Sequence, residues 1–163
     1  MPQRTILEVP DPRLRLPATP VEDFDESLKT LVADLIDTLH HSGTAIGLCA
    51  PQVADPRRVL VMDLSSRRCE PQVYINPVIQ SRARFTFAEE SCLSVPGVLV
   101  NVWRATRVLV QAQDPTGAPF ERELDGLHAV CLQHEMDHFA GKLLVDRMWF
   151  LQRLRFNRRL ARA

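Results

Sequence analysis

Two histidines four residues apart, with a carboxylate between them, are the residues whose types and spacing indicate chemistry. They lie in the segment His134-Glu135-Met136-Asp137-His138. On a helix of 3.6 residues per turn, His134 and His138 project from one face, where both imidazoles can bind one divalent ion. A carboxylate at Glu135 can accept a proton from water that the ion has acidified. The pattern predicts a hydrolytic metal site on a helix; the alternative is a pair of ordinary helix residues spaced by chance.

The third ligand of such a site does not lie downstream. Leu144 stands where a metzincin would have its third histidine, and the only acidic residue after the motif is Asp146. We therefore expect an upstream ligand, and Cys92 has the best context, because the aromatic and β-branched residues 85–87 predict a strand whose edge offers backbone N–H groups, including that of Leu93. The alternative for Cys92 is a buried, inert thiol. The other thiols and imidazoles upstream are Cys49, Cys69, Cys131, His40, His41 and His128.

Two more polar residues, Gln133 and Asp137, lie on the same predicted helix. Both could form its solvated face. We favour a supporting role for Asp137, because a metal-bound imidazole usually donates its second N–H group to an acceptor that fixes the orientation of the ring.

Three motifs in order make the sequence resemble the peptide deformylase family. That family carries Gly-hydrophobic-Gly-hydrophobic-Ala-Ala-x-Gln, then Glu-Gly-Cys-Leu-Ser, then Gln-His-Glu-x-Asp-His. The corresponding segments here are Ala45-Ile46-Gly47-Leu48-Cys49-Ala50-Pro51-Gln52, Glu90-Ser91-Cys92-Leu93-Ser94 and Gln133-His134-Glu135-Met136-Asp137-His138. The likeness continues into residues 9–14 and 141–147, so it covers nearly the whole chain. Each motif alone is weakly to moderately specific, but the three together are highly specific.

The resemblance implies a metallohydrolase that removes the N-formyl group from the formyl-methionine of nascent polypeptides and releases formate. It assigns the metal to Cys92, His134 and His138. It makes Glu135 the general base and then the general acid toward the leaving amine. It makes Gln52 and the Leu93 N–H group the hydrogen-bond donors to the oxyanion. One divalent ion is expected, Fe(II) first, with Zn, Ni or Co as alternatives, because such sites accept several first-row metals. The substrate-binding residues would be Ile46, Gly47, Ser91, Leu127, Val130 and Cys131.

Three residues depart from the family pattern. Ala45 replaces the first motif glycine, Cys49 replaces an alanine, and Ser91 replaces the glycine before the metal-binding cysteine. Glycine is often required where backbone approaches a ligand closely, and family substrates lie along the strand of Ser91. We expect the chemistry to survive and the affinity or specificity to shift. The alternative is a weakly active or non-catalytic metal-binding paralogue associated with the ribosome, which an assay of formate release would distinguish.

Composition is typical of a small enzyme with one catalytic domain over residues 1–163. The chain is 45% hydrophobic, enough to build a core, and its formal net charge of zero does not favour DNA binding. No apolar stretch has the length of a signal peptide or of a membrane span, so we expect a cytoplasmic protein. Four cysteines in such a chain suggest free thiols and a metal ligand rather than disulfides.

The pattern along the chain predicts an α+β fold with antiparallel sheets around a central metal-binding helix. Apolar residues at helical spacing predict an N-terminal helix after Asp25 that ends at Ser42-Gly43. The motif helix should run from residue 126 or 127 to residue 140, where Gly141 ends it. Strands are expected at residues 58–63, 72–75, 85–87, 98–102, 107–113 and 120–124, with a turn at residues 114–117.

The C-terminal segment, about residues 147–161, is predicted to be a basic helix. After Gly141 the only acidic residue is Asp146. Such asymmetry suggests an anionic partner, although a solvated basic face of an amphipathic helix explains it equally. Bacterial deformylases that resemble this chain carry a C-terminal helix that can dock on the ribosome, so the resemblance implies ribosome docking. The basic residues after Gly141 are Lys142, Arg147, Arg153, Arg155, Arg158, Arg159 and Arg162.

Overall fold

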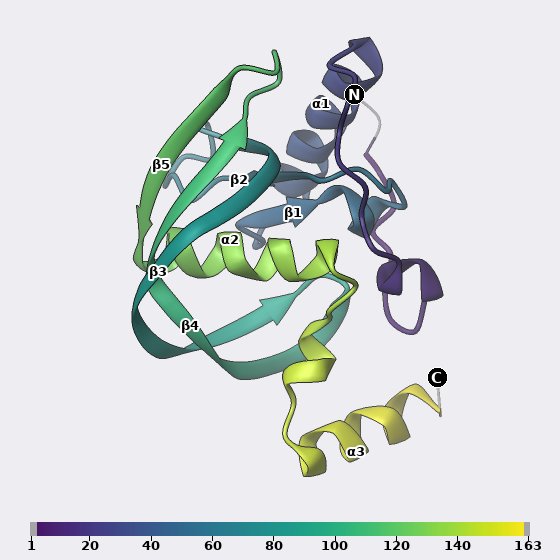
Figure 1. Cartoon of the computed structure of the whole chain (residues 1–163). Helices are drawn as coiled ribbons and strands as arrows, with labels where there is room; N and C mark the ends of the chain where they lie inside the picture. Colours follow the sequence, from purple (N-terminus) through teal and green to yellow (C-terminus); the bar gives the residue numbers. More distant parts are fainter. Residues whose placement is uncertain (1–2, 162–163) are drawn as a thin grey trace.

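A bent antiparallel sheet surrounds one helix in the computed structural model, which describes residues 3–161 (Figure 1). The five strands follow one another in chain order across the sheet, and each pairs with the next. They are β1 (Gly47–Cys49), β2 (Val59–Met62), β3 (Gln72–Cys92), β4 (Val95–Gln113) and β5 (Pro119–Asp125). The helices are α1 (Glu26–His41), α2 (Gly126–Phe139) and α3 (Phe150–Leu160), and 3-10 turns occupy Pro12–Arg15, Ala50–Val53 and Leu144–Arg147. The predicted α+β fold is confirmed.

The strands differ from the prediction in length. The short strands expected at residues 72–75 and 85–87 belong to one long strand, β3, and those at 98–102 and 107–113 belong to β4. The pairing of β3 with β4 shifts register at three points, and Asn76, at the first of them, has a positive φ angle of 50°. Such bulges bend a strand without ending it. A polar or proline-containing stretch, which in the sequence suggests the end of a strand, is therefore a bend within a continuous strand.

Helix α1 forms as its sequence predicts. Asp25 caps it, because the carboxylate accepts a hydrogen bond from the Leu28 N–H group at 2.9 Å. The apolar residues at helical spacing are buried against β1 and β2. They are Leu28, Leu31, Val32, Leu35 and Leu39. This layer fixes the short strand β1, which forms one wall of the site described below.

Helix α2 lies inside the curve of the sheet, so both its apolar and its polar residues are buried (Figure 1). Gln133 is one of them: its amide donates to the Ala105 carbonyl at 2.7 Å and accepts from the Ala105 N–H group at 3.2 Å. It therefore clamps the helix to β4 and does not belong to a solvated face. The helix begins at Gly126 and is followed by Gly141, both with positive φ. A side chain at Gly141 would collide with the backbone of Arg15.

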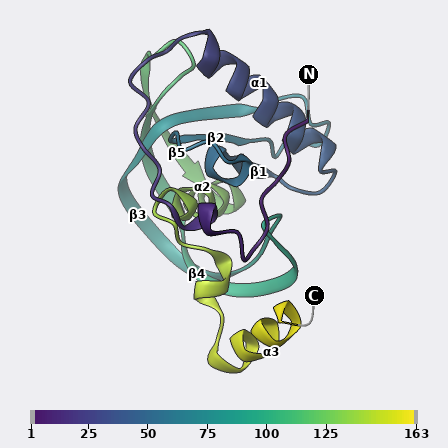
Figure 2. The same cartoon turned by 90° about the vertical axis from the view of Figure 1, so that its right-hand side faces the viewer.

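Helix α3 stands apart from the sheet in both views (Figures 1 and 2). None of its described residues is buried, and Trp149, which precedes it, is 83% exposed. The Gln152 amide donates to the Leu99 carbonyl of β4 at 2.8 Å. Arg162, the last of the basic residues, lies outside the described residues. Over residues 3–161, no helix is both long and apolar enough to cross a membrane.

Candidate metal centre and active site

The end of β3 and one face of α2 bring Cys92, His134 and His138 together. One ligand atom from each of the three lies within 4.8 Å of the other two, and the Cys92 Sγ atom is 3.5 Å from Nε2 of His138. Cys92 reaches this position because a two-residue turn, Leu93 and Ser94, follows it and pairs it with Val95. The helical spacing of the two histidines places both imidazoles on one face of α2. The chain therefore contains a Cys-His-His metal site.

The donor set fits a first-row divalent ion. A thiol and two imidazoles are ligands that such ions accept, and His138 is only 1% exposed. Burial, with a smaller contribution from nearby His134, lowers the pKa of His138 to about 3. Its imidazole is therefore neutral, as a ligand must be. Within residues 3–161, the buried Glu135 Oε2 atom has no hydrogen-bond partner, which also suits a site built to hold an ion.

The acceptor that orients an imidazole is Glu90, not Asp137. Glu90 Oε2 lies 2.8 Å from Nδ1 of His134, and Arg104 donates to both oxygens of Glu90, at 2.7 and 3.0 Å. Burial alone would raise the pKa of Glu90, but the hydrogen bonds from His134 and Arg104 lower it below the usual value. Asp137 accepts instead from Arg104 at 2.8 Å and from Arg147 at 3.1 Å. Asp137 thus acts on the site through Arg104.

Sequence reasoning missed Arg104 entirely. It lies on β4 opposite Thr86 of β3, and its side chain reaches Glu90 farther along β3 only because the two strands are paired. Glu90 belongs to a motif that the sequence analysis quoted, and its place two residues before Cys92 was the available signal for a supporting role. No comparable signal marks Arg104, because its partners are distant in sequence.

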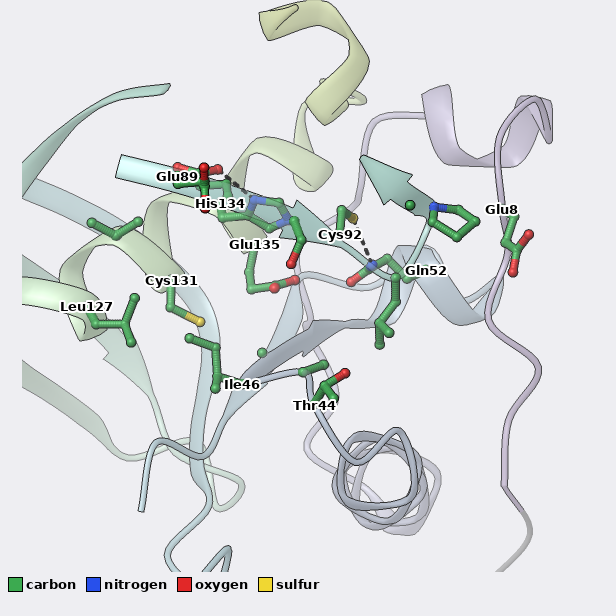
Figure 3. Close-up of a pocket in the computed structure, with 18 residues that line it drawn as sticks. Glu8, Thr44, Ile46, Gln52, Glu89, Cys92, Leu127, Cys131, His134 and Glu135 are labelled. Atoms are coloured by element: carbon green, nitrogen blue, oxygen red, sulfur yellow. Dashed lines mark hydrogen bonds and ion pairs between the residues drawn. The ribbon is translucent and has the colours of Figure 1, made fainter. Parts of the chain in front are cut away.

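Gln52 is fixed in the 3-10 turn that follows β1 and is 2% exposed. Its Oε1 atom accepts hydrogen bonds from the Cys49 N–H group at 3.1 Å and from the Cys49 thiol at 3.3 Å. Its Nε2 atom donates to Ser94 at 3.1 Å and lies 3.6 Å from Cys92 Sγ (Figure 3). The amide can adopt only this orientation, since the acceptor and donor ends have different partners. Its N–H group therefore faces the metal ligands, beside Leu93.

Glu135 points into the same space from α2 and is 4% exposed (Figure 3). Burial is the main cause that raises the pKa of its carboxyl group. Gly47 leaves room for this side chain, because a Cβ atom there would lie 2.7 Å from Glu135 Oε1 and 2.6 Å from Cys131 Sγ. Only glycine fits here, which gives the second motif glycine a physical reason.

A cavity of about 550 Å³ opens onto these residues. One side of it is apolar, and Figure 3 shows Ile46, Leu127 and Cys131 gathered there. Ser91 lies on its edge, exposed, at the last register shift between β3 and β4. Every residue that the resemblance assigned to the substrate lines this cavity: Ile46, Gly47, Ser91, Leu127, Val130 and Cys131. Seven further lining residues belong to the three motifs: Ala45, Gln52, Glu90, Cys92, Leu93, His134 and Glu135. Sequence reasoning did not anticipate the remaining five, which are Glu8, Thr44, Glu89, Pro96 and Gly97.

Known proteins are similar to this chain in both sequence and fold. The peptide deformylase of Neisseria meningitidis is 47% identical over 155 residues, which cover 95% of this chain and 92% of that protein. That of Pseudomonas aeruginosa is 46% identical over 156 residues, with the same two coverages.

Solved structures agree. The crystal structure of a peptide deformylase from Legionella pneumophila superposes with a TM-score of 0.93 at 46% identity, covering 99% of this chain and 95% of that one. The enzyme of Thermotoga maritima gives a TM-score of 0.85 at 39% identity, covering 91% of this chain and 99% of its own. The family model described as polypeptide deformylase matches residues 3–153. The chain belongs to the polypeptide deformylase family.

Proposed function

We propose that this chain removes the N-formyl group from the N-terminal formyl-methionine of newly made polypeptides and releases formate. One observation carries the proposal: the buried carboxylate of Glu135, one oxygen of which has no hydrogen-bond partner within residues 3–161, adjoins a Cys-His-His ligand set at the end of a cavity with an apolar side. A metal with a carboxylate beside it serves hydrolysis, and the apolar side suits a methionine side chain. Membership of the deformylase family supports the same reaction.

Cys92, His134 and His138 would hold the ion, with Glu90 orienting His134. A bound divalent ion acidifies water and polarises a carbonyl group. We propose Fe(II) as the native ion, and Zn, Ni and Co as alternatives, since a mixed thiolate and imidazole set accepts all of them.

Glu135 would move the proton. Its carboxylate first accepts the proton of the attacking water and then donates it to the leaving amine of methionine. A general base works best when its pKa lies near the working pH, and burial raises the pKa of Glu135 in that direction. Gly47 keeps the space around Oε1 free for this role.

Gln52 and Leu93 would stabilise the developing oxyanion. The Gln52 amide is held from both ends, so its N–H group needs no reorientation when charge develops. The Leu93 N–H group belongs to the turn after Cys92, next to the same space. The methionine side chain would occupy the apolar side of the cavity. That side is formed by Ile46, Leu127, Val130 and Cys131.

The test is an anaerobic assay of the iron-loaded protein on formyl-Met-Ala-Ser, with formate as the measured product. We expect formate release from this peptide and none from its acetylated counterpart. Absence of formate, with one equivalent of metal bound, would favour the non-catalytic paralogue instead.

We also propose that α3 docks on the ribosome, in the cytoplasm where formylated chains emerge. The described helix is basic, none of its residues is buried, and an anionic RNA surface would complement it. In co-sedimentation with ribosomes, replacing Arg155, Arg158 and Arg159 by Glu should reduce binding. The matched control replaces two exposed arginines of β3, Arg82 and Arg84, by Glu. An equal loss in both variants would contradict a role specific to α3.

A further inference from the structure

The thiol of Cys49, which stands where the family motif has alanine, has no task in the mechanism proposed above beyond its hydrogen bond to Gln52. It lies at the end of β1 and is completely buried behind the cavity wall. Its thiol donates to Gln52 Oε1 at 3.3 Å. Burial, followed by the adjacent Glu135 carboxylate, raises the pKa of this thiol. The Cys49 sulfur atom, in addition to that of Cys92, lies near Glu135 and His138 of the metal site.

The ligand atoms of Cys49, Glu135 and His138 form a second cluster. One ligand atom from each lies within 4.8 Å of the other two, the same limit that Cys92, His134 and His138 meet. The two clusters share His138. All three residues of the second cluster are buried, and Glu135 Oε2 has no hydrogen-bond partner within residues 3–161. A buried polar atom is normally satisfied, so this oxygen points to a missing ligand.

The chemistry of the second cluster favours zinc. A thiolate, a carboxylate and an imidazole are the three ligand types that zinc takes in proteins. We propose that Cys49, Glu135 and His138 form a second zinc-binding set that overlaps the first. Zinc replaces the proton of the Cys49 thiol, which passes to solvent. In this state Glu135 is a ligand and can no longer accept a proton, so zinc held in this way blocks hydrolysis.

The proposal rests on the cavity of the proposed function, but its main test requires no turnover. Cys92→Ala removes the only thiolate of the first set and leaves the second set intact. We expect this variant to retain one equivalent of zinc, measured by competition with a chromophoric chelator. Cys49→Ala/Cys92→Ala should bind zinc at least about 100-fold more weakly, because even the loss of a supporting residue outside the ligand shell costs 10- to 100-fold. The matched control is Cys69→Ala/Cys92→Ala, which removes an exposed thiol and should behave as Cys92→Ala does.

Cobalt substitution gives a second readout. Co(II) bound to Cys92→Ala should show thiolate-to-metal absorption, and Cys49→Ala/Cys92→Ala should not. Circular dichroism and thermal unfolding verify that each variant is folded, and Cys49→Ser/Cys92→Ala repeats the test with nearly the native side-chain volume. Equal zinc affinity in Cys92→Ala and in both double variants lacking Cys49 would overturn the proposal. Failure of the formate assay in the wild type would reject the proposed function alone, since zinc binding is measured separately.

Discussion

At the scale of single residues, Glu135 combines deep burial with one oxygen that has no partner within residues 3–161. Replacing it with glutamine preserves the shape of the side chain and removes the proton acceptor. We expect Glu135→Gln to keep the iron or nickel equivalent and to lose turnover by about 10²- to 10⁴-fold, the usual contribution of general acid–base catalysis. Metal analysis and formate release on the same preparation measure both. Turnover near the wild-type level with metal bound would assign the proton transfer to another group.

Ser91 is the departure that lies nearest to the path of a substrate. It is exposed on the edge of the cavity, where the strand pairing shifts register. If its hydroxymethyl group crowds a peptide joining this strand, Ser91→Gly should lower KM and leave kcat and the metal content unchanged. A change confined to KM indicates binding common to the ground and transition states. Steady-state kinetics on formyl-Met-Ala-Ser test this, and loss of activity would instead make the serine a positive contributor.

At the scale of elements, Arg104 joins β4 to both β3 and α2. It is 6% exposed and pairs with Glu90 and Asp137. Removing one partner of a buried ion pair costs about 3–5 kcal/mol, because the remaining charge stays buried. Arg104→Leu should therefore lower the free energy of unfolding by about that amount. It should also weaken metal binding by about 10- to 100-fold, since Glu90 no longer holds His134 firmly.

Arg147→Leu is the matched control for Arg104→Leu. Arg147 contacts the same Asp137, at 3.1 Å, but its side chain is 39% exposed, against 6% for Arg104. Exposed pairs contribute about 0–1 kcal/mol, so chemical denaturation should separate the two variants clearly. Equal losses would show that the buried connection to Glu90 is not what stabilises this region.

The elements differ in how far sequence predicts them. Helices α1 and α2 were predicted closely, because each has helical periodicity or a spaced motif and a chemically distinct end, such as Asp25 or Gly141. The long strands were not, because a bulge at Asn76 has the same local composition as a loop and only the partner strand reveals continuity. For the same reason the metal-binding motif pointed to His134 and His138 directly, whereas Arg104 depended on pairing between strands.

At the scale of the whole molecule, Asp63 links the C-terminal part of α1 to the end of β2. Its carboxylate accepts from Ser65 at 2.6 Å and lies 2.9 Å from His40 Nε2. Burial opposes ionisation, but the hydrogen bonds from Ser65 and then His40 outweigh it and lower the pKa below 3.8. The Asp63 carboxyl group therefore binds a proton more readily in the unfolded chain than in the folded one. The stability that its hydrogen bonds contribute is present above the unfolded pKa and is lost as pH falls through the folded pKa.

Asp63→Asn should consequently reduce stability at neutral pH and make the loss of stability in acid less steep. The reduction should be about 1–3 kcal/mol, the range for hydrogen bonds to a charged group. Urea unfolding at a series of pH values between 2 and 7 measures both effects. Asp23→Asn, which removes the same charge at an exposed position just before α1, is the control and should change neither. An unchanged acid slope in Asp63→Asn would mean that other carboxylates dominate acid unfolding.

The ligands Cys92 and His138 are 46 residues apart in the chain, and they meet only when the curved sheet has closed around α2. An ion bound between them is therefore a cross-link across most of the tertiary structure, and the unfolded chain cannot offer the same site. A free ion concentration 1,000 times the dissociation constant adds about 4 kcal/mol to stability. Protein purified without metal should thus melt at a lower temperature and be digested faster by proteases. The supply of that ion would then govern how long each molecule survives as well as whether it is active.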